Sequence, residues 1–204
     1  MQRLSLLAIF FLSASLPLCA QVVPSAMGHG LPEWSAGAGF SYFSSDIGIA
    51  SISGGTLWVN YALSKMPSFL YGIGLELEAR DLRPHGRVKK PILREDTAGI
   101  GVTYNFKNYR NVRPYAKAVF GPGNIDFVAG AGHRFNESRI ATSLGGGFDV
   151  RAYRNLWVRA DYVYQYYPDF YTSKIAPIPT GARLDPQGFT FGAVYHLARE
   201  HPAG

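Results

Sequence analysis

The sequence predicts an all-β protein, an eight-stranded antiparallel up-and-down barrel, and three observations support this prediction. Apolar and polar residues alternate with a period of two through most hydrophobic stretches, which is the period of a β-strand. Short and long connections follow one another in strict alternation along the chain. One face of the strands is almost wholly apolar, whereas the other carries glycines and charges.

The first half of the chain supplies four strands, at residues 33–43, 54–63, 69–80 and 96–106. Their alternation separates an apolar face from a face that is rich in glycine. The apolar residues are Trp34, Phe40, Tyr42, Leu57, Val59, Tyr61, Ile73, Leu75, Leu77, Ile100, Val102, Tyr104 and Phe106. The glycines are Gly37, Gly39, Gly72, Gly74, Gly99 and Gly101. Glycine weakens a strand face that meets water, but the narrow interior of an eight-stranded barrel needs small residues.

The second half supplies four more strands, at residues 112–121, 139–153, 155–167 and 188–197. The segment 155–167, NLWVRADYVYQYY, shows the alternation most clearly, because an apolar face backs onto one that contains Arg159 and Asp161. The apolar face continues with Leu144, Phe148, Val150, Phe189, Phe191, Tyr195 and Leu197. Gly145, Gly147, Gly192 and His196 fall on the other face, where His196 is expected to act as a hydrogen-bonding residue of the interior.

The connections sort by length. The short ones are 64–68, 107–111 and a tight turn near Arg154 and Asn155. The long ones are 44–53, 81–95, 122–138 and 168–187. Membrane barrels have short periplasmic turns and longer extracellular loops, so both termini are predicted to be periplasmic and the four long loops external.

The N-terminus reads as a secretory signal peptide at 1–20. Arg3 precedes a short apolar run at 4–16, and a small residue, Ala20, marks the cleavage point. We expect an N-terminal periplasmic segment at 21–32, the barrel at 33–197 and a C-terminal tail at 198–204. No cysteine follows Ala20, which excludes disulfides and thiolate metal sites in the mature chain.

The composition of the face with glycines and charges distinguishes a membrane barrel from a soluble barrel such as a lipocalin. Both types have one apolar face, but only an interior explains glycines beside nearly balanced charges. The apolar face is therefore predicted to meet lipid, which makes the barrel transmembrane. The predicted lumen charge network is Glu76, Glu78, Arg80, Lys117, Arg139, Asp149, Arg151, Arg159 and Asp161. We expect these side chains to pair across the lumen and plug it.

The signal peptide, the eight strands and the segment GGGFDVRAYRNLWVRADYVYQ resemble the small outer-membrane β-barrel family, which includes the opacity proteins, OmpX and the barrel domain of OmpA. The resemblance implies the outer membrane of a Gram-negative-type cell. It implies outer-membrane lipids, lipopolysaccharide and the barrel-assembly machinery as partners. Family barrels usually end on an aromatic residue, whereas here AREHPAG (198–204) follows the last strand.

Three functions follow from the resemblance. The expected one is a structural or cell-surface interaction role; the alternatives are a narrow porin-like channel for small solutes and a lipid A-modifying enzyme. The residue types for hydrolysis, His133, Glu137 and Ser138, share one predicted loop, but their spacing does not match a deacylase motif. No catalytic, cofactor or metal site is predicted, because the histidines are scattered. The chain is therefore not expected to be an enzyme.

Two of the long loops suggest contacts. Loop 81–95 gathers the cations Arg83, Arg87, Lys89, Lys90 and Arg94, which could meet lipopolysaccharide phosphates or simply be solvated. Loop 168–187 mixes prolines with apolar residues, which could form a surface for a partner or pack back onto the rim of the barrel. Nucleic-acid binding is not expected, because the basic loop has no stacking platform.

Overall fold

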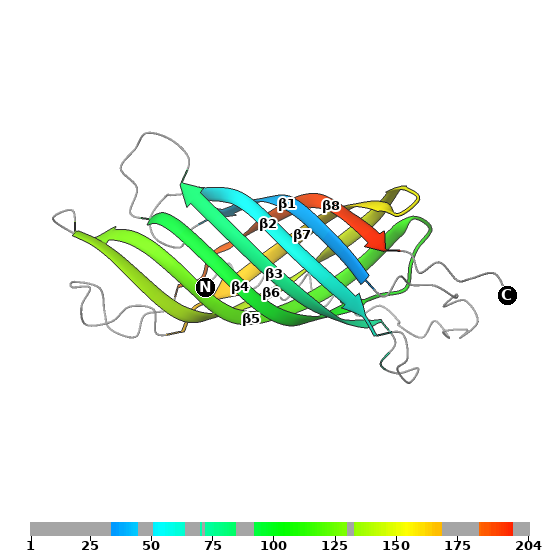
Figure 1. Ribbon diagram of the computed structural model, residues 1–204, viewed down its shortest axis with the longest axis horizontal. Helices are drawn as coiled ribbons and strands as arrows, with labels where there is room; N and C mark the ends of the chain where they lie inside the picture. The colour runs from blue at the N-terminus through cyan, green and yellow to red at the C-terminus, as the bar shows by residue number, and fades with distance from the viewer. Residues whose placement is uncertain are drawn as a thin grey trace, which may run out of the picture.

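The computed structural model is a closed barrel of eight antiparallel strands, which confirms the predicted fold class. It describes residues 34–44, 51–63, 70, 72–84, 92–129, 133–168 and 184–197. Each strand pairs with its neighbours along the chain, and β1 pairs with β8 to close the cylinder (Figure 1). The strands are β1 Trp34–Ser44, β2 Ser51–Ala62, β3 Ile73–Pro84, β4 Ile92–Asn105, β5 Val112–Ala129, β6 His133–Tyr153, β7 Leu156–Tyr166 and β8 Gln187–Leu197.

Several predicted segments lie outside the described residues. They are the signal peptide at 1–20, the segment at 21–32, the tail at 198–204, the connection at 64–68 and most of loop 168–187. In the ranges that the structure describes, no helix has the length and apolar character needed to cross a membrane.

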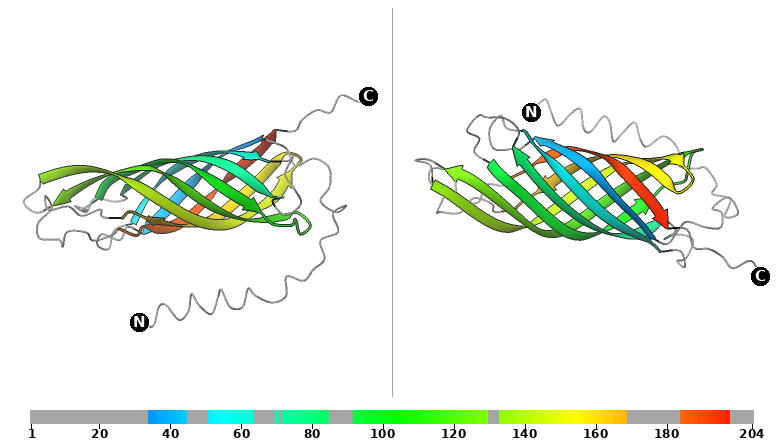
Figure 2. Two further views of the ribbon diagram at one scale, coloured as in Figure 1. Left: turned by 90° about the horizontal axis from the view of Figure 1, so that it is seen from below. Right: turned by 45° about the horizontal axis from the view of Figure 1, so that its top comes forward.

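The two ends of the barrel differ. At one end, here called the turn end, β1 begins, β8 ends, and the β4–β5 and β6–β7 connections make their short turns. At the opposite end, here called the loop end, β1 runs toward β2, β3 toward β4, β5 toward β6 and β7 toward β8 (Figure 1). The strands incline to the barrel axis in all views (Figure 2), as closing a sheet into a barrel requires.

Side chains alternate between the two faces as the sequence predicts. In β7, Trp157, Arg159 and Asp161 are buried inside the barrel, whereas Leu156 and Val158 are exposed outside it. The exposed apolar residues extend around the barrel: Trp34, Phe40, Leu57, Leu77, Ile100, Phe120, Leu144, Phe148, Phe189 and Phe191 are among them. This belt is what a barrel needs where it meets lipid.

The strands are longer at the loop end than predicted. The β5–β6 pairing continues in register from Gly121 and Ala141 to Ala129 and His133, so the predicted loop 122–138 is mostly a hairpin that projects beyond the other strands (Figure 2). Likewise β3 and β4 extend into the predicted loop 81–95, and β2 begins within 44–53. The polar outward residues of these extensions predict loops, because a strand that has left the lipid no longer needs an apolar outer face.

Outward-facing charges mark where the apolar belt ends at the loop end. On β3 the outward series runs from Leu77 through Ala79 to Asp81 and then Arg83. On β4 the residues beside them, Ala98, Asp96 and Arg94, make the same change. Asp81, Arg83, Arg94 and Asp96 form exposed ion pairs at 2.8–3.2 Å. The membrane-spanning segments of β3 and β4 therefore end near Ala79 and Ala98, and residues beyond them lie outside the membrane.

Candidate functional site

The middle of the lumen is organised by one cation, Lys117 of β5, which lies among three carboxylates. Its ammonium contacts Glu78, and it lies 2.9 Å from Asp161 Oδ2 and 3.6 Å from Glu76 Oε1. All four side chains are buried, and they come from β3, β5 and β7. Buried charges are tolerated only where opposite charges and hydrogen bonds compensate their lost hydration. This cluster therefore connects three strands that are not neighbours in the sheet.

Two arginines extend the cluster toward the two ends. Arg159 donates to both carboxylate oxygens of Asp149, at 2.9 and 3.1 Å, and to Glu76 Oε2 at 3.1 Å. On the other side, Arg80 donates to Glu78 Oε1 at 2.7 Å. The planar guanidinium suits such bidentate contacts with carboxylates, so the ion pairs form a continuous chain along the lumen.

Aromatic rings fill the space around these charges. The Arg159 guanidinium lies 4.4 Å from the ring centre of Tyr115 and 5.0 Å from that of Trp58, which stabilises the cation further. The Tyr115 hydroxyl donates to Asp161 Oδ2 at 2.7 Å. The Trp58 ring occupies the place where a Cβ at Gly37 or Gly192 would stand. These lumen glycines are therefore required by the packing, as predicted for a narrow barrel.

The loop end of the lumen is closed by an apolar layer. Five side chains from β1, β2, β3, β5 and the segment before β8 point inward and are fully buried: Phe43, Ile52, Leu82, Ile125 and Leu184. Burial of large apolar side chains is a main source of folding free energy. The loop end of the barrel therefore has a small hydrophobic core of its own, between the charged part of the lumen and the loops.

Glu95 is buried in the same layer. It accepts a hydrogen bond from the Tyr167 hydroxyl at 2.9 Å, and the Gln165 amide can donate to it at 2.8 Å while accepting from Arg80 at 3.1 Å. Glu95 pairs with Leu82, beyond the charged residues that end the apolar belt, so it lies outside the membrane-spanning segment. Burial raises the pKa of Glu95 to about 7, and the hydrogen bond from Tyr167 opposes part of that rise.

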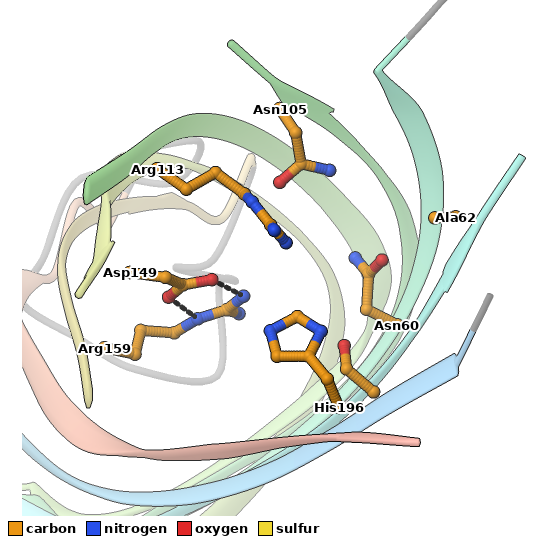
Figure 3. A pocket seen from close by; sticks show the side chains of 8 residues that line it. Asn60, Ala62, Asn105, Arg113, Asp149, Arg159 and His196 are labelled. Atoms are coloured by element: carbon orange, nitrogen blue, oxygen red, sulfur yellow. Dashed lines mark hydrogen bonds and ion pairs between the residues drawn. The ribbon is translucent and has the colours of Figure 1, made fainter. Parts of the chain in front are cut away.

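The turn end of the lumen holds a small polar cavity of about 20 Å³ (Figure 3). It is lined by Ser35, Asn60, Ala62, Asn105, Arg113, Asp149, Arg159 and His196. Arg113 Nε donates to Asn108 Oδ1 at 3.0 Å, and its guanidinium lies 4.6 Å from the Trp157 ring centre. Both ring nitrogens of His196 are buried with no hydrogen-bond partner among the described residues. The cavity has room for about one water molecule.

The buried charges of the central and turn-end lumen balance. The carboxylates are Glu76, Glu78, Asp149 and Asp161, and the cations are Arg80, Arg113, Lys117 and Arg159. Equal numbers of opposite charges in one buried region offset the cost of removing them from water. Arg80, Lys117 and Arg159 contact the acids directly, whereas Arg113 contacts Asn108 and the Trp157 ring. The arrangement is suited to holding the barrel closed.

The structure brings together most, but not all, of the predicted lumen network. Seven of the predicted residues lie in the buried lumen described above, and two do not. Arg139 lies beyond the last residue pair of β6 with β7 and contacts Glu137 at 3.4 Å while remaining partly exposed. Arg151 is exposed at the turn end and donates to the Arg154 carbonyl at 3.0 Å. Both side chains have inward parity, but Arg139 lies where β6 no longer pairs with β7, and Arg151 lies at the rim of the turn end.

Two charged residues of the lumen, Arg113 and Glu95, are absent from the predicted network. Arg113 has the same strand parity as Lys117 and could have been found from that phase. Glu95 falls in the predicted loop 81–95, because the charged residues around it do not show the apolar alternation that would indicate the start of β4. The uncharged residues Tyr115, Asn60 and Gln165 belong to the lumen as well, and parity alone predicts their inward direction.

The remaining candidate residues are dispersed. Arg83 and Arg94 are engaged by Asp81 and Asp96 on the outer surface, and Arg87, Lys89 and Lys90 lie outside the described residues. His133, Glu137 and Ser138 lie on β6 rather than in a loop. Glu137 and Ser138 are successive strand residues and point to opposite faces, which separates the residue types that hydrolysis would need. Across the ranges that the structure describes, no cluster of His, Cys, Asp and Glu could hold a metal ion.

The family model described as "Outer membrane protein beta-barrel domain" matches residues 5–196 of the sequence. Comparison with curated proteins finds no significant match.

Three solved structures share the barrel. Neisserial surface protein A is 14% identical with a TM-score of 0.58, over 80% of this chain and 96% of that one. Ail, the attachment invasion locus protein of Yersinia pestis, is 17% identical with a TM-score of 0.52, over 82% and 99%. The outer membrane protein OprG from Pseudomonas aeruginosa is 12% identical with a TM-score of 0.52, over 82% and 97%. At these identities the likeness concerns the fold.

Proposed function

Because the chain belongs to the outer membrane protein β-barrel family, we propose that it is a closed barrel with a structural or cell-surface interaction role, rather than a channel or an enzyme. The observation that carries this proposal is the Lys117 cluster, where ion pairs from β3, β5 and β7 cross the middle of the lumen. Ions would have to break these contacts to pass. The apolar layer at the loop end supports the proposal, because it adds a second barrier above the charges.

A surface role is supported by the β5–β6 hairpin. This hairpin projects beyond the other strands at the loop end (Figure 2), which the predicted topology places outside the cell. Its outward residues there include polar ones such as Asp126, Asn136 and Ser138, so this part of the hairpin is suited to water rather than lipid. Ail, a neighbour in fold, is described as an attachment invasion locus protein. Contact with lipopolysaccharide through Arg83 and Arg94, and with a surface partner through 168–187, belongs to the same proposal.

Planar-bilayer recording tests the closed lumen. The wild-type barrel should conduct at or near the baseline of the bilayer. Asp161→Ala removes one acceptor of Lys117 and the partner of Tyr115, so it should lower heat stability, seen as an earlier loss of the heat-modifiable gel mobility. Arg151→Ala, at the exposed turn end, is the matched control and should change neither property.

Two other outcomes would favour the alternatives. A steady wild-type conductance that is unchanged by Asp161→Ala and Arg159→Ala would identify a narrow channel. A change in the lipid A mass spectrum that depends on the protein would identify a lipid-modifying enzyme.

A further inference from the structure

The two short turns at the turn end carry the same three residues in the same conformation. Tyr109-Arg110-Asn111 connects β4 to β5, and Tyr153-Arg154-Asn155 connects β6 to β7. In each turn the tyrosine pairs with the residue after the asparagine, Val112 or Leu156. In each turn the arginine has a positive φ, 53° for Arg110 and 35° for Arg154.

Arginine is an unusual residue for this backbone conformation. A side chain with a Cβ is strained in the left-handed region, which glycine tolerates freely and asparagine better than most residues. These two arginines are the only non-glycine residues with positive φ in the described part of the chain. An asparagine follows each of them directly, so the strained position is not occupied by the residue that suits it better. Strain that recurs in two turns indicates that the arginine side chains serve a purpose.

The side chains of both turns project away from the barrel. Tyr109 is 72% exposed and Tyr153 is 64% exposed. The Arg110 guanidinium lies 5.8 Å from the Tyr109 ring centre, and that of Arg154 lies 5.3 Å from the Tyr153 ring centre. Neither arginine has a carboxylate partner in the part of the chain that the structure describes. Each turn thus presents a free cation beside an amphipathic ring.

The two turns form one surface. The Arg151 amide donates to the Asn111 carbonyl at 2.8 Å, and its side chain donates to the Arg154 carbonyl at 3.0 Å. The adjacent β4–β5 and β6–β7 connections are visible at the same end in Figure 1. Lys107 is exposed beside them. The cationic rim is therefore made of Lys107, Arg110, Arg151 and Arg154, with Tyr109 and Tyr153 among them.

The cationic rim differs from the loop end in its charge balance. The described acidic residues at the turn end are confined to the buried lumen, where Asp149 is held by Arg159. At the loop end, exposed cations alternate with acids, as in the ion pairs of Asp81 with Arg83 and Arg94. The rim also lies directly beyond apolar residues that face outward, Phe106 on the β4 side and Leu156 at the start of β7. It is therefore placed where lipid headgroups begin.

We propose that the cationic rim is a binding site for the phosphate groups of anionic phospholipids. Guanidinium groups bind phosphate oxygens through paired hydrogen bonds, and tyrosine favours the membrane interface. Basic residues next to a membrane are attracted to anionic lipids. The assignment to the periplasmic leaflet, which is the phospholipid leaflet, rests on the proposed outer-membrane topology. The binding itself needs only the barrel and the lipid.

The test is lipid selectivity in reconstituted membranes. The purified barrel is placed in phosphatidylcholine vesicles with increasing fractions of phosphatidylglycerol, and its preference is measured with spin-labelled lipids. The wild type should prefer phosphatidylglycerol, and Arg110→Asn with Arg154→Asn should reduce that preference by about fivefold per arginine at low salt. Added salt should weaken the wild-type preference, because ions screen exposed charges.

The double asparagine variant also separates binding from folding. Asparagine suits the positive φ better than arginine, so the variant should be at least as stable as the wild type in pure phosphatidylcholine. Arg134→Asn with Arg139→Asn removes two cations from the loop-end part of β6 and should retain the lipid preference. Equal preference in the wild type and the turn variant, or a loss that is equally large in the loop-end control, would overturn the proposal. A conducting lumen would refute the proposed function but leave this result unchanged.

Discussion

At the scale of single residues, Lys117 is the side chain on which the closed lumen depends most. Three carboxylates from two strands share its one charge, and no other cation contacts Asp161 as closely in the described contacts. Arg159 and Arg80 each bind one side of the same group of acids. The loss of Lys117 would therefore leave Asp161 without a cation among the described contacts, and three buried carboxylates compensated only by Arg80 and Arg159.

Lys117→Met tests this dependence. The methionine keeps the volume but removes the charge, and breaking a buried pair from one side costs about 3–5 kcal/mol. Urea unfolding in detergent or lipid should show a destabilisation of that size. Arg151→Met, an exposed residue on the next strand, is the control and should be nearly neutral. A neutral Lys117→Met would mean that the lumen is hydrated enough to accept unpaired carboxylates.

Glu95 predicts a pH dependence for the loop end. Its pKa in the folded protein is about 7, above the ordinary value of 4.5, because it is buried. The folded state holds a proton that the unfolded chain has already released, so the contribution of Glu95 to stability is greatest below about pH 4.5 and is lost as the pH rises through 7. Glu95→Gln should remove this slope in urea midpoints measured from pH 4 to pH 8.

Glu137→Gln is the matched change at the same end, on a partly exposed residue, and should leave the slope in place. Persistence of the slope in Glu95→Gln would assign it to another group.

At the scale of elements, β5 and β6 pass through two environments along their length, first lipid and then water. The part nearer the turn end faces lipid with residues such as Phe120 and Leu144. The part at the loop end projects and has polar outward residues such as Asn124 and Ser138. Pro122 lies near the transition, where the β4–β5 pairing is interrupted between Phe120 and Gly123. Proline cannot donate to the ladder, so its position fits this gap.

Two substitutions on the same face of β6 locate the edge of the membrane. Leu144→Arg places a charge within the apolar belt and should cost about 2–4 kcal/mol near the bilayer midplane. Ser138→Arg lies on the same face, beyond the last pair of β6 with β7, and should be close to neutral. Folding into vesicles of known lipid, followed by urea unfolding, gives both values. Equal costs at the two positions would place the hairpin wholly inside or wholly outside the bilayer.

The strands could be predicted from the sequence because lipid imposes a strict alternation on every membrane-spanning residue. The inward and outward sets of β7 and β8 follow from parity alone. The loop-end extensions could not be predicted, because outside lipid both faces can be polar and the alternation fades. For the same reason the sequence predicts a loop at Glu95, and it cannot show that β6 separates from β7 before Arg139. The sequence shows the two Tyr-Arg-Asn turns, but only the structure shows that they lie side by side.

At the scale of the whole molecule, the barrel has a cationic turn end and a loop end of mixed charge, separated by an apolar belt. Such an asymmetry needs a defined orientation in the membrane. Epitope tags inserted within 85–91 or 169–183 should bind antibody on intact cells, whereas tags within 64–68 or at 107–111 should bind only after permeabilisation. Labelling in the reverse pattern would invert the topology and place the cationic rim at the cell surface.

The pairing of β1 with β8 has a consequence for how the chain reaches this state. These two strands pair along their whole length, from Trp34 with Leu197 to Ser44 with Gln187, although they stand at opposite ends of the chain. Until the last strand arrives, any partly assembled sheet has two unpaired edges, which are templates for aggregation. Contacts between distant parts of a chain also form slowly. The barrel therefore cannot close before β8 is present, and we expect the joining of the first strand to the last to be the closing step of folding.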